Sequence, residues 1–180
     1  MIRRLSIALA AVVLAGTLTS GCSTFTANRN AASVNDQHLS VKQYQAMLAG
    51  LAQAPDAFGI APVGAEGLPG KTARGILGQW VTNTIMSEAL ASKGASVSTA
   101  DRKALEDKIL AGNAAAVWKQ LSPELQSFVL DAQSLQPAFE AAFGTDAAQT
   151  LTNSATAATV IIDSRYGMWD VATGQVVATR

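Results

Sequence analysis

The most regular pattern along the chain is an apolar stripe that begins after Lys71. Its members recur at spacings of three and four and so share one helical face: Ile76, Leu77, Trp80, Val81, Ile85, Ala89 and Leu90. Gly94 ends the pattern, because glycine readily takes the left-handed conformation that closes a helix. Ser98 can cap a following helix, and Asp101 stands three residues later, as in a capping box. We therefore expect two helices joined by a corner between residues 71 and 109.

The C-terminal half continues as helix. Ser122 and Pro123 are a favoured cap and a favoured first helical residue, so they predict the start of another long helix. Pro137 lacks a backbone donor and is expected to kink or divide that helix. Gly144 ends it, and residues 146–153 predict a last short helix.

Extended segments are predicted at the two ends of the mature chain. A polar turn around Asp36 separates two short extended runs within residues 32–41, and Ser40 is placed to cap the helix that follows. Residues 158–163 are rich in β-branched side chains and predict a strand. Because no other strand candidate stands out, we expect the two ends to pair. The predicted fold class is mainly α with a small antiparallel β-sheet that pairs the N- and C-terminal strands.

A segment rich in proline and glycine separates the first predicted helix from the long one. Residues 54–70 hold three prolines and four glycines, so the pattern predicts a long surface loop without a regular element. The loop also carries Phe58, Ile60 and Val63. These side chains either cover the core or fold over a groove.

The first residues have the pattern of a secretory signal. Arg3 and Arg4 precede an apolar run, and small residues lead up to Gly21, so residues 1–21 are interpreted as a signal peptide. The apolar run is about 14 residues long, shorter than the roughly 20 that a membrane-spanning helix needs. Cys22 follows at once, and this arrangement resembles the lipobox of bacterial lipoproteins. Thr19 departs from it, since leucine is usual at that position.

Cys22, the chain's one cysteine, is therefore the predicted lipidation site. A diacylglycerol and an N-acyl chain on Cys22 would hold the protein firmly at a membrane. Residues 22–30 then form a tether, residues 31–180 form a single domain, and the expected location is extracytoplasmic, at the cell membrane or the outer membrane. The alternative is an ordinary secreted protein with a free thiol.

Composition and motifs offer no signature of an enzyme. The 13 basic residues equal the 13 acidic ones, so we expect no nucleic-acid partner. His38 is the single histidine and has no marked partner for a metal site or a catalytic triad. Glu106 and Asp107 stand among basic residues, as on a solvated helical face. We predict no enzymatic activity, no cofactor and no metal.

Three segments resemble the SurA-type periplasmic chaperones and the related PrsA-type foldase lipoproteins. The opening ASVNDQHLSVKQYQAML is similar to the start of that family, and VIIDSRYGMWD is similar to its closing strand. Between them, Ala89 and Gly94 followed by Val97, Ser98 and Asp101 resemble the family's helix corner. The three segments keep the family's order and together span about residues 31–170.

The resemblance implies a SurA N-terminal-like helical domain and a tethered chaperone-like function. The family's prolyl isomerase domain has no room here, because the closing strand follows Phe143 within about 15 residues. The partners implied are unfolded or secreted polypeptides. Met and aromatic side chains adapt to varied partners, which gives the candidate peptide-binding set Met47, Trp80, Met86, Trp118, Phe128 and Phe139.

Each member of this set is also a natural core residue. Two other functions stay open at this point: a structural or single-partner lipoprotein of the cell envelope, and a small-molecule binding protein with its pocket under residues 54–70.

Overall fold

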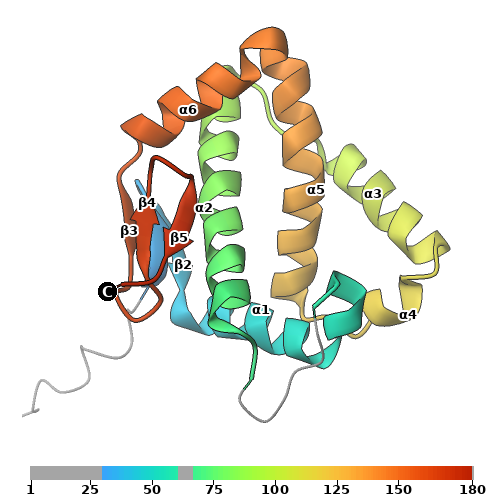
Figure 1. Ribbon diagram of the computed structural model, residues 1–180. Coiled ribbons are helices and arrows are strands. Elements are labelled where there is room, and N and C mark those ends of the chain that lie inside the picture. Colours follow the sequence, from blue (N-terminus) through green and yellow to red (C-terminus); the bar gives the residue numbers. More distant parts are fainter. Residues whose placement is uncertain (1–29, 61–66, 180) are drawn as a thin grey trace, which may run out of the picture.

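The computed structural model describes residues 30–60 and 67–179 (Figure 1). The helices are α1 (Val41–Gln53), α2 (Gly70–Ser92), α3 (Thr99–Ala111), α4 (Ala115–Trp118), α5 (Pro123–Phe143) and α6 (Ala147–Ala157), with 3-10 turns at Pro55–Phe58 and Gly144–Asp146. The strands are β1 (Asn30–Val34), β2 (Gln37–Ser40), β3 (Val160–Ile162), β4 (Met168–Asp170) and β5 (Gln175–Val177). The signal peptide, Cys22, residues 23–29 of the predicted tether and Val63 lie outside the described residues. The tether was predicted to extend to residue 30, but Asn30 is the first residue of β1 and so belongs to the domain.

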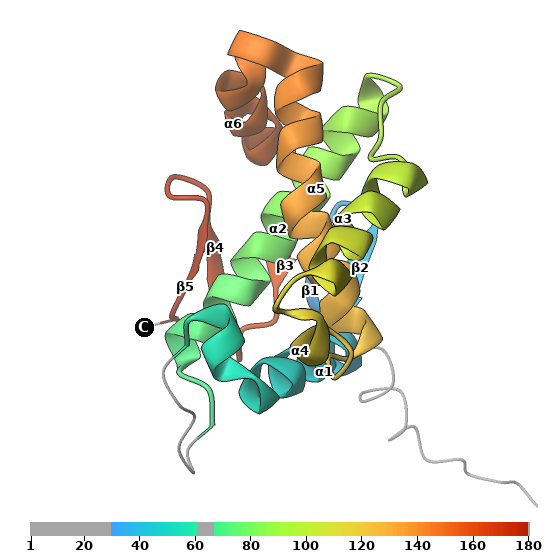
Figure 2. The same ribbon diagram turned by 90° about the vertical axis from the view of Figure 1, so that its right-hand side faces the viewer.

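Helix α2 is the centre of the domain. α2 packs along α5, and the C-terminal half of α2 contacts α6. β1 and β5 also contact α2. Figures 1 and 2 show α1 near one end of the α2–α5 pair, α6 at the other, and α3 beside α5. Among the described helices, none is both long enough and apolar enough to cross a membrane.

The two ends of the domain pair as the sequence predicts. The three-stranded sheet has the order β2-β1-β3, and both pairings are antiparallel. Ala32 lies opposite Leu39 on β2 and opposite Ile162 on β3. A mainly α fold with a small antiparallel sheet near the termini is thus confirmed.

A second hairpin, formed by β4 and β5, was not expected from the sequence. Asp170 holds its turn: its backbone oxygen accepts from the Gly174 amide, and its carboxylate accepts from the Ala172 amide and the Thr173 hydroxyl. The hairpin packs on α2, where a Cβ at Gly78 would lie 3.5 Å from the Val176 backbone nitrogen. The expectation of strands only at residues 32–41 and 158–163 is therefore wrong, because β4 and β5 pair with each other and pack on α2.

The predicted helix ends are confirmed by their caps. The hydroxyl oxygens of Ser40, Ser98 and Ser122 each accept a hydrogen bond from the backbone amide three residues later. Ser40 and Gln43 form a complete capping box. Gly94 has a φ of 71°, in the left-handed region that the corner requires.

Two expectations about proline need correction. Of the two effects expected of Pro137, division of the helix is wrong, since α5 runs without interruption from Pro123 to Phe143. Residues 54–70 do contain a regular element, the 3-10 turn of Pro55–Phe58. Phe58, Ile60 and Leu68 pack against the main core, so the described part of this segment covers the core.

Tyr44 joins three distant parts of the chain. Its side chain is fully buried, its hydroxyl donates to the Ala73 carbonyl at 2.7 Å, and its ring meets the Tyr166 ring edge to face at 5.0 Å between centroids. Burial, reinforced by the neighbouring Tyr166, raises the pKa of Tyr44 from 10.0 to about 12. The contacts tie α1, the first turns of α2 and the C-terminal segment together.

We expect Tyr44→Phe to reduce the free energy of unfolding by about 1 kcal/mol, because the Ala73 hydrogen bond is lost. The raised pKa means that Tyr44 contributes its stability fully below pH 10 and loses it as the pH rises through about 12. Urea unfolding of the chain from Ser23 onward at pH 9 and pH 11.5 tests both points. The variant should lose less stability than the wild type over this interval, and equal losses would contradict the assignment.

Gly167 stands where only glycine fits. Its φ is +136°, and a Cβ there would lie 2.3 Å from the Val177 backbone oxygen. We expect Gly167→Ala to cost at least about 3 kcal/mol of unfolding free energy. Gly174→Ala is the matched control, since Gly174 also has a positive φ but open space around it, and it should cost about 1 kcal/mol. Similar urea midpoints for the two variants would refute the clash.

Candidate binding cleft

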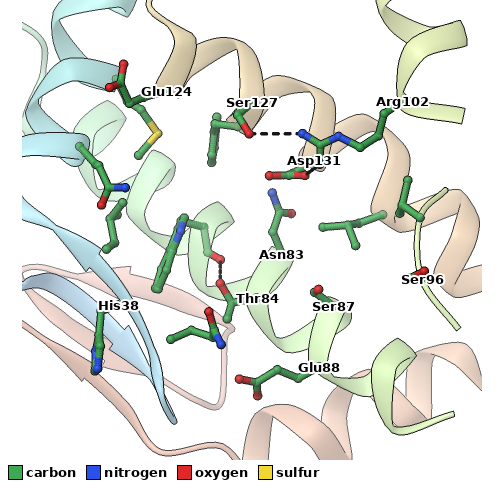
Figure 3. Close-up of a pocket in the computed structure, with 18 of the residues that line it drawn as sticks. His38, Asn83, Thr84, Ser87, Glu88, Ser96, Arg102, Glu124, Ser127 and Asp131 are labelled. Carbon is green, nitrogen blue, oxygen red and sulfur yellow. Dashed lines mark hydrogen bonds and ion pairs between the residues drawn. The ribbon is translucent and has the colours of Figure 1, made fainter. Parts of the chain in front are cut away.

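A cleft of about 600 Å³ lies between α2 and α5 and is bordered by β2, α1 and α3 (Figure 3). From α2 it is lined by residues at helical spacing: Trp80, Asn83, Thr84, Ser87, Glu88 and Ala91. From α5 it is lined in the same way by Glu124, Ser127, Phe128, Asp131 and Leu135. Each set forms a stripe of about three turns, so the cleft runs for roughly 16 Å along the helices.

One part of the cleft wall is apolar. Trp80 is partly exposed. Met47 and Phe128 are almost fully buried in the main core, and they line the cleft only with the small part of their surface that stays exposed. An aromatic ring next to a flexible methionine suits contact with apolar groups of varied shape.

Asn83 is the one buried polar side chain of the described residues, with 5% of its surface exposed. Its Oδ1 accepts from the Gln79 side-chain amide at 2.8 Å, but its Nδ2 has no partner. Figure 3 shows its amide within the cleft, directed toward the side where Asp131 and Ser127 lie. Because a buried donor without a partner costs about 1–3 kcal/mol, this position suits an acceptor brought by a ligand.

Arg102 and Asp131 form an ion pair that joins α3 to α5 at the rim of the cleft. Arg102 also donates to the Ser127 hydroxyl at 3.2 Å. Burial raises the pKa of the Asp131 carboxyl, and the Arg102 guanidinium acts in the opposite direction. Among the described residues that line the cleft, Arg102 is the one basic side chain besides His38, and it is thus already paired.

Two further carboxylates face the cleft. Glu88 accepts a hydrogen bond from the Asn35 side-chain amide at 2.6 Å. Asn35 follows β1 and exchanges two hydrogen bonds with the backbone of Thr159, the residue before β3. Glu124 lies exposed in the first turn of α5. Neither glutamate forms an ion pair with a basic side chain of residues 30–60 or 67–179.

The structure divides the six residues proposed for peptide binding. Met47, Trp80 and Phe128 line the cleft. Met86 and Phe139 pack in a second core cluster around Leu90, and Trp118 packs in the main cluster. These three are buried and do not line the cleft, so their place is in the core.

Sequence reasoning missed Asn83, Asp131 and Glu88 as cleft residues. Asn83 offered one signal, since a polar residue stands between Trp80 and Ile85, inside an apolar stripe. Asp131 and Glu88 offered none, because each lies on a helical face that also suits solvent. Within the described part of the chain, no group of three potential metal-ligating side chains lies together.

We expect Arg102→Ala to lower the unfolding free energy by about 1 kcal/mol at pH 7, because it leaves the half-buried Asp131 carboxylate unpaired. The pKa of Asp131 is already raised, and losing Arg102 should raise it further. A raised carboxyl pKa favours the folded state at low pH, so the defect should shrink when the pH is lowered toward 4. Urea unfolding at pH 7 and pH 4.5 measures this change. The double variant with Asp131→Asn should lack this recovery at low pH, and an equal recovery there would contradict the pairing.

Comparison with known proteins gives no relative for this chain: no family model, no curated protein and no solved structure matches it.

Proposed function

We propose that this chain is a membrane-tethered, extracytoplasmic chaperone-like protein that binds unfolded or secreted polypeptides without isomerase activity. The observation that carries the proposal is the cleft between α2 and α5, whose wall includes Trp80, Met47 and Phe128. A cleft that combines adaptable apolar groups with polar groups along its length suits polypeptide segments. Its volume of about 600 Å³ accommodates a few side chains at a time.

The tether and the location rest on the sequence alone. Residues 1–21 and Cys22 have the pattern of a lipoprotein signal and its acylated cysteine. The fold supports a tethered arrangement in one respect. The tether would enter the domain at β1, in the middle of the three-stranded sheet, so it would pull on a strand that is paired on both sides.

A second candidate is a small-molecule binding protein of the cell envelope. The cleft volume lies within the range of ligand pockets, about 300–1,000 Å³, and the unpartnered Asn83 amide could orient a small ligand. The described residues of 54–70 do not line the cleft, so this cleft is not the pocket that was expected under that segment. A single-partner envelope lipoprotein would use the same cleft for one dedicated sequence.

The test is suppression of aggregation. The chain from Ser23 onward contains every residue of the three core clusters, and it is added to two unrelated unfolding substrates, with a prolyl isomerisation assay beside it. We expect suppression without isomerase activity. Trp80→Ala should weaken suppression several-fold, because it removes a partly exposed aromatic side chain from the cleft wall.

Ile161→Ala is the matched control. Ile161 is 62% exposed on β3, away from the cleft, and the substitution removes apolar surface of the same kind. Circular dichroism of both variants verifies folding. A loss of suppression in Ile161→Ala but not in Trp80→Ala would place client binding outside the cleft. No suppression at several-fold excess would reject the general chaperone function and favour a single partner.

A further inference from the structure

The charges of the cleft are unbalanced. Its acidic side chains are Glu88, Glu124 and Asp131, and Arg102 neutralises only the last of them. Glu88 and Glu124 come from different helices and lie toward opposite ends of the cleft in Figure 3, with Asn83 between them. Carboxylates without basic partners in a partly enclosed space attract cationic groups.

The middle of the cleft offers a donor. The Nδ2 of Asn83 has no partner although the side chain is more than nine-tenths buried. Its other amide atom is already held by Gln79, which fixes the orientation of the group. The complementary ligand therefore carries a hydrogen-bond acceptor between its cationic groups, and a peptide carbonyl has this character.

One wall of the cleft is a strand edge. Gln37, His38 and Leu39 of β2 line it, and β2 is the outer strand of the sheet order β2-β1-β3. The odd-numbered residues of the β1 segment direct their backbone N–H and C=O groups toward β3. The Asn35 amide donates to the Thr159 carbonyl, and the Asp163 amide donates to the Ala31 carbonyl. Ser33 is one of these residues, and it lies opposite His38 on β2. Because Ser33 directs its backbone groups toward β3, the antiparallel pair of Ser33 and His38 is not hydrogen-bonded, and the backbone N–H and C=O of His38 point away from β1. Such an edge is a template for an extended chain.

The dimensions agree with a short extended segment. A cleft of roughly 16 Å accommodates about five residues at ~3.3 Å each. Alternate side chains of that segment would point toward the same wall, so one apolar side chain could meet Trp80 and Phe128 while basic side chains on either side reach toward Glu88 and Glu124.

We infer that the cleft selects extended polypeptide segments in which basic residues flank an apolar one. The inference rests on the proposed polypeptide-binding function and adds the charge and conformation of the segment that is bound. Glu88 and Glu124 receive the basic side chains, Asn83 donates to a backbone carbonyl, and β2 supplies the strand edge. A free polyamine shares the cationic chemistry but has neither a carbonyl for Asn83 nor a backbone for β2.

The experiment measures binding of three synthetic pentapeptides to the chain from Ser23 onward by titration calorimetry. Each has phenylalanine at its centre, serine on either side, capped termini, and two outer positions occupied by lysine, glutamine or glutamate. Spermidine is titrated separately. We expect the lysine peptide to bind at least tenfold more tightly than the glutamine peptide, with an affinity that falls as salt is added. The glutamate peptide should bind most weakly.

Three variants locate the site. Glu88→Gln and Glu124→Gln should each reduce the affinity for the lysine peptide by about threefold to tenfold and leave the glutamine peptide unchanged. Glu140→Gln is the matched control, because Glu140 is exposed on α5 but does not line the cleft. Asn83→Leu should weaken both peptides about tenfold, while thermal unfolding shows a stability equal to or above that of the wild type, since a buried unpaired donor is removed.

Each outcome bears on a different claim. Equal binding of the lysine and glutamine peptides would overturn the charge selection and leave polypeptide binding intact. Binding of spermidine with no binding of any peptide would overturn the peptide ligand. No binding of any probe, together with no suppression of aggregation, would reject the proposed function itself. An unchanged affinity in Glu88→Gln and Glu124→Gln, with a loss in Glu140→Gln, would move the cationic site out of the cleft.

Discussion

The packing around Tyr44 is the constraint on which the rest of the domain depends. A fully buried phenol must place its hydroxyl against an acceptor, and the Ala73 carbonyl at the start of α2 is that acceptor. The ring then meets Tyr166, which follows β3. One side chain therefore sets α1 against α2 and brings the end of the chain to both. The cleft follows from this arrangement, because the position of α1 decides where Met47 stands relative to α2.

Most of the fold can be predicted from local physics. Serine caps, glycine stops and the three-and-four spacing of apolar residues define the helices, since each signal lies within a few residues of its effect. The pairing of β1 with β3 followed from the small number of strand candidates. The hairpin of β4 and β5 could not be predicted, because its strands depend on packing against Gly78 of α2 more than on their own pattern.

The candidate site was predicted only in part. Trp80, Met47 and Phe128 were identified because methionine and aromatic side chains suit contact with varied partners. The polar side of the cleft depends on how α2 and α5 are rotated against each other, and a helical wheel does not contain that rotation. Asn83 illustrates the difference: its place inside an apolar stripe is a signal of burial, but that stripe does not reveal that the amide lines a cleft between α2 and α5.

The place of β1 in its sheet has a consequence for how the protein is made. β1 can pair with β2 as soon as residue 40 has been synthesised and released, but its second neighbour, β3, lies some 125 residues later. Closing so long a loop is slow compared with forming a local hairpin. Until residue 162 has been made, the edge of β1 that later pairs with β3 is unpaired. Until residue 177 has been made, α2 is not covered by β5. A chain whose central strand must wait for its last segment stays incompletely folded until that segment has been made.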